Sequence, residues 1–198
     1  MAEFARLVDE SGMKEESLFA RLVEKIADLA GNPYNDRLPE PFRPLRAHVE
    51  TIAQRVENEI PEKAGRLWNT LAGYFLTIAE YAQARSISER ALAIDERGFG
   101  PDHQQVATDL AYLELVLKAL GDFAGAKASL ERALRIDEQV YGPEHPEVAA
   151  VANNLGTVLQ DLGDFAGAKA SLERALRIDE QVYGPEHPEV ATDANNLG

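Results

Sequence analysis

The chain has 198 residues, of which 45% are hydrophobic, a formal net charge of −14 and no cysteine. The missing cysteines exclude disulfide frameworks, thiolate nucleophiles and cysteine-rich zinc sites, and the acidic charge disfavours nucleic acid, whose phosphates require a basic surface. No apolar run reaches the ~18 residues of a membrane span, and residues 1–12 lack the pattern of a secretory signal. We therefore expect a cytoplasmic protein with neither a nucleic-acid nor a membrane partner.

Residues 1–60 are predicted to form a degenerate helical segment that caps or introduces the rest of the chain. Residues 15–30 and 41–59 have a helical pattern. Gly31, Asn32 and Pro33 lie between them, followed by a proline-rich stretch that breaks helices.

Residues 61–198 are predicted to form a repeat array. Residues 121–156 and 163–198 are identical except at Ala150/Thr192 and Val151/Asp193, so the period is 42. A block written twice indicates stacked structural units, each burying its apolar face on the next. The expected repeats are 61–102, 103–144, 145–186 and a partial unit at 187–198.

Each repeat is predicted to contain two amphipathic helices, because its apolar residues recur in steps of three and four. A glycine such as Gly163 suits the end of the first helix, and Asp164 is a favourable N-cap for the second. Gly184 can end the second helix, and Pro188 fits the first turn of the next. The expected first helices are 62–78, 103–119, 145–161 and 187 onward, and the expected second helices are 81–97, 123–140 and 165–182.

The helix pair at 62–97 carries a spaced set of residues: Trp68, Leu71, Ala72, Phe75, Ala84 and Ala91. This order of Trp, Leu, small, aromatic and then Ala resembles the tetratricopeptide repeat (TPR), whose common period is ~34 residues. The longer period, with its Gly-x-x-His-Pro-x-Val-Ala connection, is similar to the kinesin light chain type and to sensor arrays of bacterial NB-ARC/STAND signalling proteins. The resemblance implies an all-α, right-handed superhelix of antiparallel helix pairs. Glu114 departs from the family's small residue, so looser packing is expected in the second repeat.

The asparagine pairs inside the first helices are the leading candidate site, since each Asn costs a helix about 0.5–0.7 kcal/mol relative to Ala. The resemblance implies that these positions line a concave groove, where side-chain amides grip a peptide backbone. The alternative is that the amides bridge neighbouring repeats without binding a ligand. The candidate peptide-binding residues are Asn69, Asn153, Asn154, Asn195, Asn196, Arg66, Tyr112, Lys118, Thr157 and Gln160.

No catalytic, cofactor-binding or metal-binding residue is predicted. His103, His145 and His187 recur every 42 residues, too far apart to converge on one ion, so a capping or loop role is expected. Trp68 is expected in the core. The sequence has no phosphate-binding loop, nucleophile elbow or zinc-protease motif, and its carboxylates are expected largely on polar faces.

These features predict a non-catalytic scaffold that binds a protein or peptide. The leading context, by resemblance, is the sensor or interaction fragment of a larger bacterial signalling protein. The sequence ends midway through an expected helix, which indicates a fragment of a longer array. The alternative is a structural array that self-associates end to end, because an uncovered terminal repeat exposes apolar surface.

Overall fold

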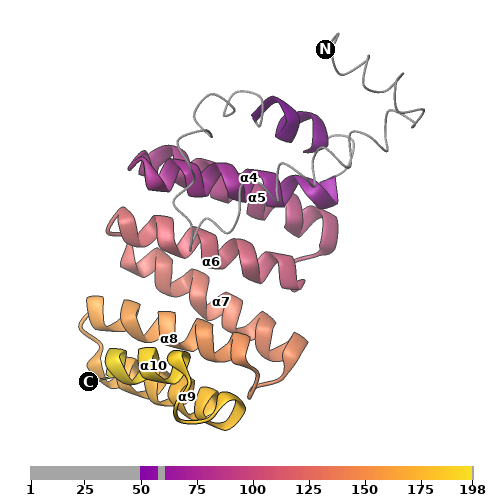
Figure 1. Ribbon diagram of the computed structural model, residues 1–198. Coiled ribbons are helices and arrows are strands. Elements are labelled where there is room, and N and C mark those ends of the chain that lie inside the picture. The colour runs from indigo at the N-terminus through magenta and orange to yellow at the C-terminus, as the bar shows by residue number, and fades with distance from the viewer. Residues whose placement is uncertain (1–49, 58–60, 198) are drawn as a thin grey trace.

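The computed structural model describes residues 50–57 and 61–197, and it is all-α over that part of the chain (Figure 1). The expectation for residues 1–49 lies outside the described residues, while residues 50–57 are helical. The helices that follow are α4 (Pro61–Thr77), α5 (Tyr81–Phe99), α6 (Gln104–Ala119), α7 (Phe123–Tyr141), α8 (Pro146–Asp161), α9 (Phe165–Tyr183) and α10 (Pro188–Leu197). The predicted all-α fold class is confirmed.

The helices form antiparallel pairs, α4 with α5, α6 with α7 and α8 with α9, and α10 packs on α9 (Figure 1). We call α4, α6, α8 and α10 the A helices, and α5, α7 and α9 the B helices. Consecutive pairs also contact each other through α5–α6 and α7–α8. The result is the predicted TPR superhelix, in which each repeat is packed on its neighbour. None of the helices in the described part of the chain is long and apolar enough to cross a membrane.

The tight turn from an A helix to a B helix follows the predicted chemistry. Gly121 and Gly163 adopt φ values of 76° and 78°, which glycine tolerates without a steric penalty. Asp122 and Asp164 then cap α7 and α9, each accepting a hydrogen bond from the backbone N–H three residues ahead. In the first repeat, Ala79 takes the glycine's place at φ 61°, and the N-cap Glu80 makes no side-chain capping bond.

A histidine begins each of three A helices, as the sequence predicted. His103 Nδ1 and His145 Nδ1 accept the N–H of the residue two positions ahead at 3.2 Å, and His187 does so at 3.3 Å. Each imidazole also stacks on the last aromatic residue of the preceding B helix, with ring centroids 4.4–4.5 Å apart. The predicted capping role is confirmed.

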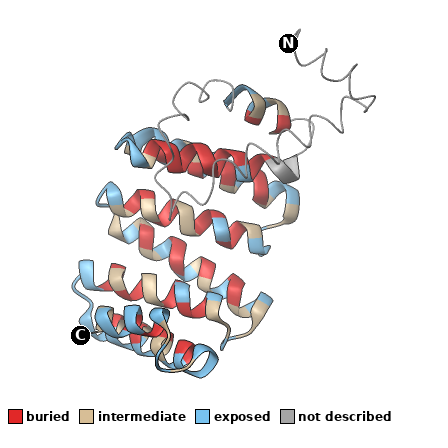
Figure 2. Cartoon of the chain, in the orientation of Figure 1, coloured by how far each residue is buried: buried red, intermediate tan, exposed pale blue. Residues whose placement is uncertain are grey.

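The core lies between the helix layers, where the buried residues gather in Figure 2. Trp68 is 2% exposed, as expected of a core residue, and the Arg90 guanidinium lies 4.1 Å from its ring centroid. Gly156 lets α8 and α9 approach closely, because a Cβ there would lie 2.5 Å from Leu172 Cγ. The corresponding position of α6 holds Glu114, which is buried with its carboxylate 3.6 Å from Lys118 Nζ.

Candidate functional site

Polar side chains join the A helices of successive repeats. Lys118 Nζ of α6 donates to Thr157 Oγ1 of α8 at 3.2 Å. Asn196 Nδ2 of α10 donates to Asn153 Oδ1 of α8 at 3.0 Å, and Gln160 Nε2 donates to the Asn196 carbonyl at 3.0 Å. We call these five residues, with Asn154 and Asn195, the A-helix row. They form a continuous polar track from α6 to α10.

The A-helix row is neither sealed in the core nor fully exposed. Gln160 and Asn195 are exposed, and the remaining members are half-buried. Asn154 and Asn195 have no side-chain hydrogen bond among the bonds of the described residues, while Asn153 and Asn196 use part of their amide capacity on each other. An amide has two donor hydrogens and two acceptor lone pairs, so the row keeps unused hydrogen-bonding capacity at an accessible surface.

Asn69 occupies a different environment from the other predicted site residues. It is 4% exposed, and its Nδ2 donates to Asp109 Oδ1 at 2.5 Å. The bond joins α4 to α6, so this amide bridges neighbouring repeats, which is the role that the sequence left open as the alternative. None of the hydrogen bonds among the described residues joins Asn69 to the A-helix row.

Arg66 and Tyr112 lie on α4 and α6, toward the N-terminal end of the array. Arg66 is exposed, Tyr112 is half-buried, and both have interactions with other residues. Burial raises the pKa of the Tyr112 phenol, Arg66 lowers it and Asp109 raises it. Tyr112 is therefore a neutral hydrogen-bonding group at neutral pH.

The expectation that carboxylates lie largely on polar faces was wrong at one recurring position of the B helices. Asp95, Asp137 and Asp179 are each at most 6% exposed, and each directly follows a buried Ile of its B helix. Burial raises the pKa of Asp95 to about 6 and that of Asp137 to about 6, and it also raises the pKa of Asp179. Their 42-residue spacing next to buried Ile positions was a signal that the sequence contained.

Two further aspartates are buried on the A helices, and sequence reasoning missed them as well. Asp109 and Asp193 occupy corresponding positions of α6 and α10, at 0% and 4% exposure. Burial, and then the charge of Asp95, raise the pKa of Asp109 to about 8. Burial, and then the charge of Asp179, raise the pKa of Asp193 to about 6. These groups are enclosed between helices, so they are not placed to act on a bound substrate.

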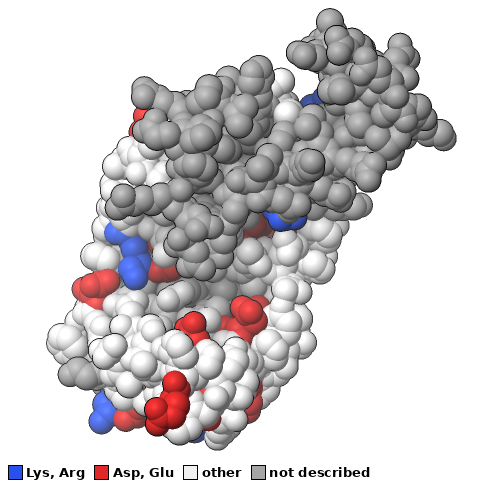
Figure 3. Space-filling view, viewed as in Figure 1, with Lys and Arg blue, Asp and Glu red and all other residues white. Residues whose placement is uncertain are grey.

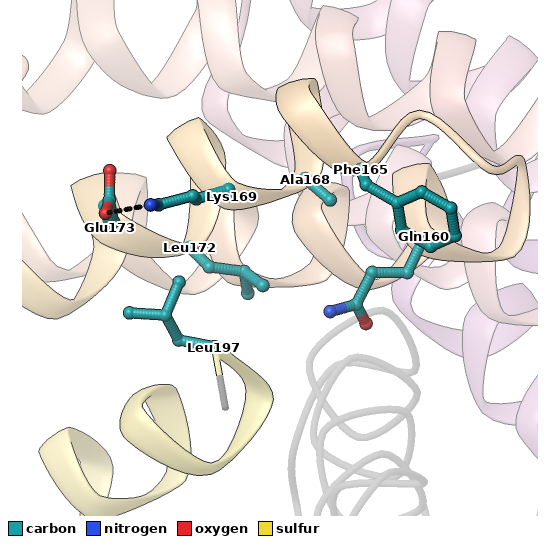
Figure 4. Close-up of a pocket in the computed structure, with 7 residues that line it drawn as sticks. All are labelled: Gln160, Phe165, Ala168, Lys169, Leu172, Glu173 and Leu197. Carbon is teal, nitrogen blue, oxygen red and sulfur yellow. Dashed lines mark ion pairs between the residues drawn. The ribbon is translucent and has the colours of Figure 1, made fainter.

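A depression lies at the C-terminal end of the array, beside the A-helix row (Figure 4). Phe165 projects into it and is 71% exposed, while Leu172 and Leu197 face each other from α9 and α10. Lys169 and Glu173 form an ion pair of 3.6 Å along its side. Gln160 belongs both to this depression and to the A-helix row, so the two surfaces are continuous.

Charged side chains of both signs occur on the described surface. On the face in Figure 3, basic and acidic side chains of the described residues are scattered among uncharged ones. Within residues 50–57 and 61–197, no three His, Cys, Asp or Glu side chains are grouped so that they could hold a metal ion. Uncharged amides therefore dominate what the A-helix row can offer a ligand.

The comparisons with solved structures agree with this architecture. BtubC (BKLC) from P. vanneervenii superposes with a TM-score of 0.78 at 22% sequence identity, covering 99% of this chain and 76% of that chain. The nearly identical TPR-like repeats of a putative kinesin light chain from Podosopora anserina, in a substituted form, superpose with a TM-score of 0.74 at 18% identity. This match covers 93% of this chain and 85% of that chain. A second structure of those repeats gives 0.70 at 18% identity, covering 89% and 82%. These similarities show the fold.

The family assignment comes from the sequence itself. The tetratricopeptide repeat model matches residues 63–139, 115–181 and 147–198, which together span more than half of the chain. None of the curated proteins compared with the sequence matches it significantly. The overlapping matches follow the helix pairs described above, and the chain belongs to the tetratricopeptide repeat family.

Proposed function

We propose that the protein is a non-catalytic scaffold that binds a segment of another protein along the A-helix row. The observation that carries the proposal is the polar track from α6 to α10, in which partly exposed amides on α8 and α10 continue from the Lys118–Thr157 bond and are linked by Asn153–Asn196. Amides in a fixed array can pair with the N–H and C=O groups of an extended backbone. An extended peptide is therefore the ligand that this chemistry fits best.

The row favours backbone recognition over recognition of charge. Its members carry one cation, Lys118, whose ammonium group is already engaged with Thr157 and lies near Glu114. The chain as a whole is strongly acidic, which would repel an acidic partner. The partner segment in this proposal is neutral or basic, and sequence preference comes from neighbouring apolar surface such as the Phe165 depression.

The finer context is also a proposal. The long repeats resemble sensor arrays of bacterial signalling proteins, so we place the chain in the cytoplasm as an interaction module of such a protein. A gene that encodes a nucleotide-binding switch domain in the same polypeptide would support this context.

Replacement of the amides tests the binding surface. Partners captured on the intact chain would be identified by mass spectrometry, and their affinity measured for an Asn153→Ala/Asn154→Ala/Asn195→Ala variant. We expect a loss of affinity of at least about tenfold with helicity unchanged, because Ala is the better helix former. Gln139→Ala, on the exposed side of α7, is the matched control and should bind normally. Normal binding by the triple variant would refute the proposed surface.

A second candidate function is structural self-association through the depression on α9. Phe165 is exposed, whereas the corresponding Phe123 of α7 packs against the core, although the two helices have the same sequence. A second copy that covers this apolar face would make the array an assembly unit. Sedimentation velocity over a concentration series, with Phe165→Ser as the disrupting variant, distinguishes this function from a monomeric scaffold.

A further inference from the structure

Two buried carboxyl groups meet where the first repeat packs on the second. Asp95 of α5 is 1% exposed and Asp109 of α6 is 0% exposed, and the two carboxyl groups lie close enough for each to affect the pKa of the other. From α4, Asn69 donates to Asp109 Oδ1 at 2.5 Å. Gly65 of α4 packs so closely on Asp95 that an added Cβ would lie 2.3 Å from Asp95 Oδ2. The pair therefore joins all three helices of this junction.

The charges that face the pair do not neutralise it. Glu96, on α5, adds a further negative charge near Asp109. On α6, the pKa of Tyr112 is affected by both Asp109 and Arg66. Arg66 is the cation that α4 contributes to this region. None of the ion pairs among the described residues includes Asp95 or Asp109, and each keeps one buried oxygen without a hydrogen-bond partner. Two neighbouring carboxylates, buried away from water, cannot both carry a charge at low cost.

We propose that Asp95 and Asp109 share one proton, and that this proton controls whether α5 stays packed on α6. We call this contact the joint between the first and second repeats. With the proton present, one carboxyl donates to the other and α5 stays packed on α6. When the proton leaves, two adjacent carboxylates repel each other inside the junction. The α4–α5 pair then separates from α6, and the Asn69–Asp109 bond that links the A helices is lost with it.

The direction of the pH effect follows from the raised pKa values of the pair. Burial is the main cause that lifts the pKa of Asp95 to about 6 and that of Asp109 to about 8. An unfolded chain has aspartate pKa values of about 3.9. The folded state therefore holds more protons than the unfolded state between about pH 4 and 8. The contribution of the pair to the free energy of unfolding therefore has its full value below about pH 4 and is lost as the pH rises through about 8.

The equivalent positions at the two later repeat junctions provide an internal comparison for this joint. At the next junction, Asp137 corresponds to Asp95, but Val151 replaces the second carboxyl. At the last junction the pair is present again as Asp179 and Asp193, with Glu189 and His187 as the other titratable groups around it. Val151/Asp193 is one of only two differences between the copied blocks. The pH response is therefore greater at the first and last junctions than at the middle one.

The test removes the second carboxyl from the first junction. Asp109→Val copies the middle junction, and Asp109→Asn keeps the shape of the side chain with a donor that cannot titrate. Urea unfolding of the full chain between pH 5 and 9 gives the unfolding constant at each pH. Each proton that the folded state holds and the unfolded state does not changes the unfolding constant by up to about tenfold per pH unit. When they unfold near pH 7, both variants should therefore release about one proton fewer than the wild type.

A direct readout and a reverse variant complete the experiment. The side-chain carboxyl carbon of Asp109, followed by NMR in the full chain, should titrate far above pH 4. Val151→Asp should steepen the pH dependence, because it adds a second carboxyl at the middle junction. Amide hydrogen exchange, corrected for its intrinsic pH dependence, should show α4 and α5 opening more readily at pH 8.5 than at pH 6, and this difference should vanish in Asp109→Asn.

Three results would overturn the proposal. Equal pH dependence in wild type and both Asp109 variants would show that no shared proton exists. A normal titration of Asp109 near pH 4 would show the same. Stabilisation of the wild type by calcium or magnesium, abolished by a chelator and by Asp109→Asn, would make the pair a cation site and not a proton-operated joint.

Discussion

At the residue scale, Ala79 carries a backbone conformation that suits glycine. It is the one non-glycine residue with positive φ, at 61°, in the part of the chain that the structure describes. Gly121 and Gly163 occupy the corresponding turns of the later repeats. The left-handed conformation costs a residue with a Cβ about 1–2 kcal/mol, so Ala79→Gly should stabilise the fold by about 1 kcal/mol. Thermal unfolding checks this, with Gly163→Ala as the reverse change, which should destabilise; a lower melting temperature for Ala79→Gly would contradict it.

The histidine caps give a second prediction at this scale. His145 Nδ1 accepts the Glu147 N–H, and its ring stacks on Tyr141. His145→Ala removes both contacts and should lower the free energy of unfolding by about 1 kcal/mol. His145→Asn keeps an N-cap acceptor and should recover most of the loss in urea denaturation. If the two variants lose the same stability, the cap contributes little and the stack dominates.

Residue-scale roles were harder to predict from sequence than the helices. Asn69 and Asn153 occupy corresponding positions, yet the structure buries Asn69 against Asp109 and leaves Asn153 half-exposed beside Asn196. The difference depends on which residue the next A helix presents, which is 40 or more residues away in the chain. The buried aspartates escaped notice for a related reason. Burial of a carboxyl group normally needs a partner, and that partner belongs to another repeat.

At the element scale, the spacing of α8 and α9 depends on Gly156. A Cβ there would lie 2.5 Å from Leu172 Cγ and 3.3 Å from the Ala168 carbonyl. Gly156→Ala should therefore destabilise by about 1–3 kcal/mol through overpacking, although Ala is the better helix former.

Gly98 provides the matched control for Gly156. It lies exposed near the end of α5, and a Cβ there would meet nothing within 4 Å. Gly98→Ala should therefore stabilise by about 0.5–1 kcal/mol through helix propensity alone. Chemical denaturation of both variants separates the two effects, and stabilisation by both would mean that α8 and α9 can move apart without cost.

Helices and their boundaries were predictable because the same sequence pattern occurs in several repeats and can be compared among them. The Gly-Asp turns and the His-capped starts recur at fixed spacing, and the observed helices begin and end within two residues of the expected positions. Repetition also explains why Glu114 stood out in the sequence. The structure shows that this carboxylate is buried beside Lys118, at a position where α4 and α8 carry Ala72 and Gly156.

At the scale of the whole molecule, stacking gives the protein a long surface on which a ligand can contact several repeats at once. Lys118, Asn153 and Asn196 come from three different A helices and are joined across the stack. A change at a junction between α6 and α10 therefore alters the spacing of groups along the row. A proton-operated joint at Asp95–Asp109 would make the packing of α4 and α5 on α6, at the N-terminal end of the row, depend on pH.

Site-specific photo-crosslinking tests the central claim most directly, namely that the A-helix row is the binding surface. A photoreactive amino acid would replace Gln160 or Asn195 on the A helices and, in control proteins, Gln139 or Gln181 on the exposed side of the B helices. With the captured partner present, the account predicts crosslinks from the A-helix positions and none above background from the B-helix positions. Crosslinks that arise mainly from Gln139 and Gln181 would place the binding surface on the opposite side and contradict the account.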